Sequence, residues 1–156
     1  MATPPDAKIE QMLTEARVVL PGAQALFGFQ LAIVLTQSFE HLSSASKIIH
    51  ALCILLVALS VVLLMAPAAF HRITYAGEDT QDMYRIGSAL VTIATLPLAL
   101  GLAGDVYVVI AKITGSPAAG GAASAVSLIV LTGLWHIYPL TAVYVRKRLG
   151  TTVTAL

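Results

Sequence analysis

The residues best suited to chemistry in this 156-residue chain are histidines, acids and amides that lie within or beside long apolar stretches. His136 lies well inside the last stretch, where an imidazole could accept a proton or contact a ligand. The alternative is a neutral histidine that bonds a backbone carbonyl or a neighbouring helix. Thr132, His136 and Pro139 share one helical stripe, and Pro139 leaves the carbonyl of Trp135 without its helical hydrogen-bond donor.

Four further ionisable residues gather at the predicted outer end of the helices: Glu40, His41, His50 and Asp105. Side chains of these types can sense pH or bind a cation. Their spacing matches no metal-binding motif, and such residues are common where a helix meets water, so a solvated rim is the alternative. Asp105 lies about 12 Å from the centre of its helix, at about 1.5 Å per residue. Since no acid lies at mid-membrane, the sequence disfavours a proton-coupled exchanger with a central carboxylate.

The first apolar stretch begins at an arginine and contains three glutamines, although unpaired amides are costly in hydrocarbon. Arg17 and Gln24 fall on one helical stripe, and Gln30 and Gln37 lie roughly opposite. We therefore expect neighbours on more than one side of this helix. Amides that bond across helices are one interpretation, and the polar lining of a pore or cavity is the other. The candidate pore-lining or partner-facing residues are Arg17, Gln24, Gln30, Gln37 and His136.

The sequence lacks the motifs typical of enzymes and of nucleic-acid-binding proteins. It has no Ser–His–acid arrangement of recognisable spacing, no paired histidines at metal-binding spacing, no phosphate loop and no dinucleotide fingerprint. The net charge is +1, and no basic stripe with interleaved aromatic residues is present. We therefore predict a protein that is not an enzyme and that has no catalytic residues, cofactor, metal or nucleic-acid partner.

The composition indicates which elements must position these residues. Apolar residues make up 58% of the chain and charged residues 11%, whereas roughly 25% of residues are charged in soluble proteins. The mean hydropathy is +0.87. This composition predicts an all-α membrane protein in which four helices cross the bilayer in up-down-up-down order. The predicted spans are about 18–39, 47–70, 85–111 and 122–145.

The segment before the first span predicts a short amphipathic helix. Thr3-Pro4-Pro5-Asp6 is typical of a helix start, and apolar residues then recur at i, i+3, i+4 and i+7 from Ile9. We expect this helix either to lie in the headgroup region or to extend the first span into solvent. The predicted organisation is an N-terminal amphipathic segment (1–16), a transmembrane domain (17–148) and a C-terminal tail (149–156).

The basic residues predict the orientation of the chain in the membrane. Seven of the nine lysines and arginines fall on the side that holds both termini, and only Lys47 and Lys112 fall on the other side. Because basic residues accumulate on the cytoplasmic side, both termini are predicted to be cytoplasmic. The seven residues are Lys8, Arg17, Arg72, Arg85, Arg146, Lys147 and Arg148.

Three segments resemble a known family: RVVLPGAQALFGF at 17–29, APAAFHR at 66–72 and LWHIYPL at 134–140. They are similar to an uncharacterised family of small four-span bacterial membrane proteins of unknown function. Some members of that family carry an automatic label of sodium:proton antiporter. The resemblance implies a multi-pass protein of the bacterial inner (plasma) membrane.

Two classes of function follow from these observations. The first is a non-catalytic integral membrane protein that acts through helix–helix association, as a homo-oligomer or as an accessory subunit of a membrane complex. Its partners would be the lipid bilayer and either itself or other membrane protein subunits. The alternative is a small oligomeric ion or solute transporter or channel, for a cation or a proton.

Overall fold

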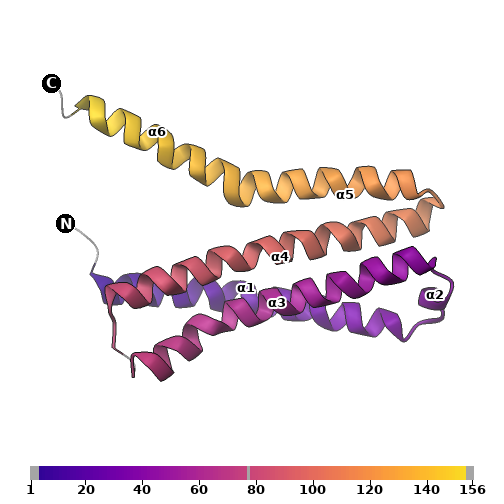
Figure 1. Cartoon of the computed structure of the whole chain (residues 1–156), viewed down its shortest axis with the longest axis horizontal. Helices are drawn as coiled ribbons and strands as arrows, with labels where there is room; N and C mark the ends of the chain where they lie inside the picture. The colour runs from indigo at the N-terminus through magenta and orange to yellow at the C-terminus, as the bar shows by residue number, and fades with distance from the viewer. Residues whose placement is uncertain (1–3, 77, 154–156) are drawn as a thin grey trace.

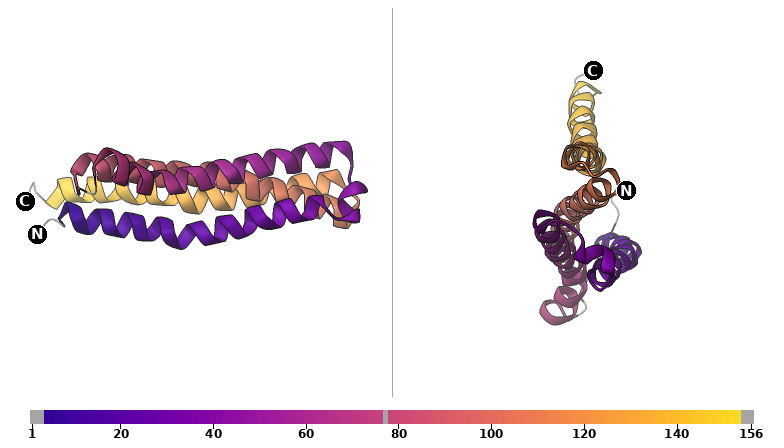
Figure 2. Two further views of the ribbon diagram at one scale, coloured as in Figure 1. Left: turned by 90° about the horizontal axis from the view of Figure 1, so that it is seen from below. Right: turned by 90° about the vertical axis from the view of Figure 1, so that its right-hand side faces the viewer.

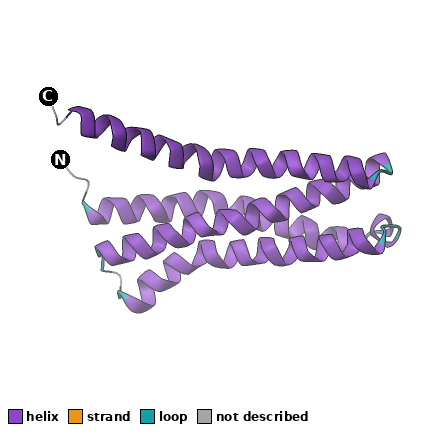
Figure 3. Ribbon diagram, turned by 45° about the horizontal axis from the view of Figure 1, so that its top comes forward, coloured by secondary structure: helices purple, strands orange, loops and turns teal. Residues whose placement is uncertain are grey.

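The computed structural model describes residues 4–76 and 78–153, and the regular structure in these ranges is entirely helical (Figures 1 and 3). This confirms the predicted all-α class. The elements in chain order are α1 (Pro5–Val34), α2 (Gln37–Glu40), α3 (Ser44–Thr74), α4 (Gln81–Thr114), α5 (Pro117–Thr132), the π-helical turn η1 (Gly133–Ile137) and α6 (Tyr138–Val153).

Four helices are long and apolar enough to cross a membrane, as predicted: Asp6–Val34, Ser44–Thr74, Gln81–Thr114 and Pro117–Arg148. The last of these, which we call the fourth span, runs through α5, η1 and most of α6. The first helix ends at Val34, a few residues earlier than expected. Thr36 causes this early end, because its hydroxyl donates to the carbonyl of Ile33 and accepts from the amide of Phe39, which starts α2.

The N-terminal segment is the beginning of α1 and not a separate helix. Ile9 and Met12 are buried against Met83 of α4, and Phe70 of α3 packs on the same cluster. The acids of this segment remain exposed on the opposite side. The apolar stripe that suggested a helix in the headgroup region is therefore covered by the protein itself. Further along, Pro21 lies inside α1, which is bowed in the left view of Figure 2.

Helices α1, α3 and α4 share a common core and are called the three-helix unit below. Ala23 of α1, Val57 and Leu64 of α3, and Ala94 and Leu98 of α4 form its apolar centre. The buried positions of α3 alternate by four and three residues, the spacing of helices that pack side by side. These positions are Ser46, His50, Cys53, Val57, Ser60, Leu64 and Pro67.

The fourth span lies beside the three-helix unit and packs mainly on α4 (Figures 1 and 2). Near its start, Gly120 is buried against Tyr107 and Ala111 of α4. None of its most apolar 18 residues is buried, and α6 diverges from α4 in Figure 1. The fourth span is therefore attached to the other three helices along one side only.

The two ends of the molecule are named by the elements that lie there. The start of α1, the turn between α3 and α4 and the end of α6 lie at one end, which we call proximal (Figure 1). α2 and the connection between α4 and α5 lie at the other end, which we call distal (Figure 1).

Candidate functional site

Three polar residues meet inside the distal part of the three-helix unit: Gln30 of α1, His50 of α3 and Asp105 of α4. The side-chain amide of Gln30 donates from Nε2 to Oδ2 of Asp105 at 2.6 Å. Nε2 of His50 lies 3.0 Å from the backbone oxygen of Gln30. Nδ1 of His50 lies 3.4 Å from Oδ1 of Asp105. We call these three residues the distal cluster, and it joins three helices through polar contacts.

The distal cluster is shielded from solvent. Gln30 is 2% exposed and His50 is 3% exposed, while the side chain of Asp105 is 18% exposed. Two of its oxygen atoms, Oε1 of Gln30 and Oδ1 of Asp105, are buried and receive no hydrogen bond from the described residues. The contact between Nδ1 of His50 and Oδ1 of Asp105 is thus close enough for an ion pair but does not have hydrogen-bond geometry.

Short helix α2 covers the distal cluster. The ring of Phe39 meets the imidazole of His50 edge-on, with the ring centroids 5.5 Å apart. Lys47 lies in the first turn of α3, about one turn before His50. Its Nζ donates to the backbone oxygen of Glu40 at 2.9 Å and lies over the ring of Phe39. These contacts tie the loop between α1 and α3 down over the imidazole.

A pocket of about 300 Å³ lies at the distal end of the molecule. Ser46 of α3 and Tyr107 of α4 line it, together with His41 and Lys112. Ser46 is one helical turn before His50 on the buried stripe of α3. The pocket therefore reaches a residue one helical turn from His50, although His50 itself does not line it.

The predicted group of four ionisable residues is brought together only in part. His50 and Asp105 contact each other, whereas Glu40 and His41 are exposed and join neither of them through a hydrogen bond or ion pair that involves their side chains. Gln30 was assigned to a different predicted group, yet it completes the cluster. The described residues contain no group of three His, Cys, Asp or Glu side chains that could hold a metal ion.

One sequence signal for this site was missed. Ser46, His50, Cys53 and Ser60 lie on one stripe of α3, whose positions alternate by four and three residues, and all are buried. The large residues Leu52, Leu55, Leu59 and Val62 are exposed. In a membrane, small and polar residues face neighbouring helices, because large apolar side chains are equally stable in lipid. This pattern would have placed His50 inside the protein. Ser60 confirms the rule, since its hydroxyl donates to the backbone oxygen of Ala94 on α4 at 2.8 Å.

His136 makes a second polar contact between helices, near the middle of the fourth span. Its Nε2 lies 3.1 Å from Oγ1 of Thr95 on α4. The hydroxyl of Thr95 donates to the backbone oxygen of Thr92 at 2.6 Å, so its oxygen accepts from His136. His136 lies in η1, where the amide of Tyr138 bonds the carbonyl of Gly133, five residues back. This wide turn comes just before Pro139, as expected where a proline cannot donate.

The remaining predicted residues do not join either contact. Arg17 and Gln24 are exposed on α1, and Gln37 is exposed on α2. None of the three makes a side-chain hydrogen bond to another described residue. Gln30 faces α3 and α4, whereas Arg17 and Gln24 are exposed elsewhere on α1 and Gln37 lies outside α1.

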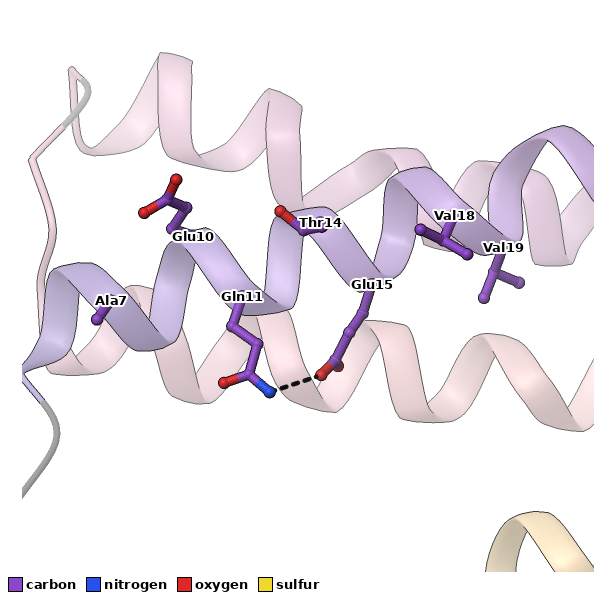
Figure 4. A pocket seen from close by; sticks show the side chains of 7 residues that line it. All are labelled: Ala7, Glu10, Gln11, Thr14, Glu15, Val18 and Val19. Carbon is purple, nitrogen blue, oxygen red and sulfur yellow. Dashed lines mark hydrogen bonds between the residues drawn. The ribbon is translucent and has the colours of Figure 1, made fainter.

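A surface hollow of about 550 Å³ runs along the exposed side of α1 near the proximal end (Figure 4). Its walls are Ala7, Glu10, Gln11, Thr14, Glu15, Val18 and Val19, all from α1, and the amide of Gln11 donates to Glu15 at 3.2 Å. Because a single helix supplies every wall, this hollow is open surface and holds no converging polar groups.

The four apolar helices and the polar contacts between them define a multi-pass membrane protein of the all-helical class. Residues 4–139 match the Family of unknown function (DUF6328), which covers most of the chain, and the protein belongs to this family. Neither a curated protein nor a solved structure matches the chain.

Proposed function

We propose that the protein is a non-catalytic integral membrane protein that acts through helix–helix association, as a homo-oligomer. One observation carries this proposal. Gln24 is exposed on α1, and its side-chain amide has no hydrogen-bond partner among the described residues. Gln24 lies about 15 Å from the end of α1 at Val34, near the centre of a hydrocarbon core of about 30 Å. An unpaired amide is costly there, and a bond to a neighbouring helix removes that cost.

The surface around Gln24 allows a second helix to approach closely. Gly28 and Ala32 follow Gln24 on the same stripe, and both are exposed. A Cβ atom placed on Gly28 would meet nothing within 4 Å. Small residues of this kind let helix backbones come together in a membrane, where packing and hydrogen bonds drive association.

A second copy of the chain has the surface that fits this face. The fourth span presents a long uncovered apolar side. At the proximal end, α1 exposes the acids Asp6, Glu10 and Glu15, and α6 carries the basic run 146–148. In the proposed pairing, α1 of one copy lies beside the fourth span of the other, with the acidic and basic segments adjacent.

We further propose that the helices cross the membrane in up-down-up-down order with both termini in the cytoplasm. The seven basic residues that predict this orientation belong to segments at the proximal end, whereas Lys47 and Lys112 lie toward the distal end. Together with the resemblance noted above, this supports the bacterial inner membrane as the location.

The test is the mass of the purified protein in mild detergent and in nanodiscs. We expect a homo-oligomer, and we expect Gln24→Leu to weaken its association constant by about threefold or more while the fold is kept. Gln37→Leu is the matched control, because Gln37 is an exposed glutamine outside the long helices. A strictly monomeric particle would contradict the proposal, and a single copy bound to a different membrane protein would indicate an accessory subunit instead.

The distal cluster favours a second candidate function, the transport of a cation or proton by an oligomer. A carboxylate and an imidazole inside membrane-length helices are common on ion pathways. Below the cluster, however, the three-helix unit is filled by Val57, Leu64, Ala94 and Leu98. The path would therefore have to leave the three-helix unit at the distal cluster and continue between copies. Flux of H⁺, Na⁺ or K⁺ into proteoliposomes tests this function, and rates equal to those of empty vesicles would exclude it.

A further inference from the structure

The hydrogen-bond pattern of the distal cluster fixes where one proton must lie. The backbone oxygen of Gln30 can only accept, so Nε2 of His50, 3.0 Å away, carries a hydrogen and donates it. In a neutral imidazole the other nitrogen, Nδ1, is then an acceptor. Nδ1 faces Oδ1 of Asp105 at 3.4 Å, and an ionised carboxylate oxygen is an acceptor as well. Two acceptors would therefore oppose each other between α3 and α4.

One additional proton removes this conflict. On Nδ1 it makes an imidazolium that pairs with the carboxylate 3.4 Å away, and on Oδ1 it makes a carboxylic acid whose hydroxyl faces Nδ1. The surroundings of Oδ1 of Asp105 are consistent with a proton between Oδ1 and Nδ1, because Oδ1 is buried and receives no hydrogen bond from the described residues. Gln30 already donates to Oδ2 at 2.6 Å, which leaves Oδ1 as the oxygen that faces the proton.

We propose that Gln30, His50 and Asp105 form a buried proton-binding site that holds α1, α3 and α4 together at the distal end. The proton enters from the distal side, where Ser46 lines the pocket one helical turn before His50. When the proton leaves, the carboxylate and the lone pair of Nδ1 repel each other and the distal contact loosens. All three residues belong to one copy, so the site exists whether or not the protein associates or transports ions.

Other titratable groups surround the site and must be separated from it experimentally. On the α3 stripe, Cys53 follows His50 by one turn and its Sγ packs against Gly104 of α4, next to Asp105. Gln30, the α1 member of the cluster, is uncharged. The other nearby groups in the described chain are Glu40 and His41 beside α2, Lys47 on α3, and Tyr107 and Lys112 on α4.

The proposal predicts whether the stability of the folded protein rises or falls with pH. In the unfolded chain a histidine loses its proton at about pH 6.5. Above that pH the native cluster still holds its shared proton, so the native chain binds more protons than the unfolded chain. Stability therefore falls as the pH rises, until the native cluster has released its proton as well.

Asp105→Asn is the decisive variant, because an asparagine reproduces the protonated acid. Its side-chain NH₂ can donate to Nδ1 of His50 while its oxygen accepts from Gln30, without any shared proton. We expect the melting temperature of the wild-type full chain in detergent to fall between about pH 6.5 and pH 8, and that of Asp105→Asn not to fall over this range. If the melting temperatures of the wild type and of Asp105→Asn changed with pH in parallel, the proposal would be overturned.

Asp79→Asn is the matched control, because His71 and Asp79 form an exposed pair at the proximal end, 3.1 Å apart. Between about pH 6.5 and pH 8 it should keep the wild-type fall in melting temperature, as should Cys53→Ser, because a thiol in the unfolded chain titrates only near pH 8.5. Nitrogen NMR of labelled histidines in the wild-type protein shows directly which ring nitrogens carry a hydrogen, without any substitution. We expect Nε2 of His50 to carry a hydrogen across this pH range, and a hydrogen on Nδ1 alone would overturn the proposal.

Discussion

His50 and His136 both lie inside membrane-length helices, yet their surroundings differ in the features that matter for proton chemistry. His50 is buried between α1 and α4, faces the carboxylate of Asp105 and donates to a backbone oxygen. His136 lies at the boundary between the fourth span and α4, is partly exposed and contacts only a threonine hydroxyl among the described residues.

The difference arises from the number of helices that meet at each residue. α3 contacts both α1 and α4, so a polar side chain on its buried stripe has two helices from which to find partners. The fourth span packs mainly on α4, so His136 has one. A histidine within a membrane helix is therefore not by itself a sign of proton chemistry, because its neighbours decide whether a second ionisable group can reach it.

The largest expected effect separates the two histidines directly. His50→Ala should lower the free energy of unfolding by about 3 kcal/mol, because it leaves Asp105 partly buried beside an empty position. His136→Ala should lower it by about 1 kcal/mol, since a single hydrogen bond between helices is lost. Unfolding in mixed detergent micelles, followed by circular dichroism, measures both. Equal losses would show that the two environments do not differ in energy.

The sequence was sufficient to predict the four membrane helices, because each is a long apolar run that hydrocarbon requires to be helical. It also named Gln30, His50 and Asp105 as candidates. It did not place them together, since helical spacing shows which residues share a face but not which residue of another helix lies opposite. His50 was expected near water because it is only about 9 Å from the start of α3, but α2 folds back and covers it.

The position of the fourth span was also beyond what the sequence shows. Its composition resembles that of the other spans, so the sequence does not indicate that it packs mainly on one helix. The small residues that permit close packing differ in location, however. Gly101 and Gly104 lie near the middle of α4, against Val57 and Cys53 of α3. On the fourth span only Gly120, near its start, is packed in this way, whereas Gly121 and Gly133 have no neighbour that an added Cβ would meet within 4 Å.

A second prediction uses these glycines to sharpen the comparison between the two regions. In Gly104→Ala the new Cβ would collide with Sγ of Cys53, and forcing atoms into a packed interface costs about 1–3 kcal/mol. Gly133→Ala meets open space and should be neutral or stabilise the protein by about 0.5 kcal/mol, through the lower entropy of the unfolded chain. The melting temperatures of both variants test this prediction. If Gly133→Ala lowered the melting temperature as much as Gly104→Ala, the prediction would be contradicted.

The smallest expected effect concerns the contact between Thr95 and His136 itself. A double-mutant cycle with Thr95→Val and His136→Phe isolates its energy, since both changes remove the polar partner and roughly keep the size of the side chain. Hydrogen bonds between membrane helices contribute about 0.6 kcal/mol on average, because each group also finds other partners in the unfolded state. We expect a coupling energy of that size. A coupling energy as large as the loss expected for His50→Ala would show that the single contact of His136 equals the contacts of the distal cluster, and the contrast with His50 would then have to be abandoned.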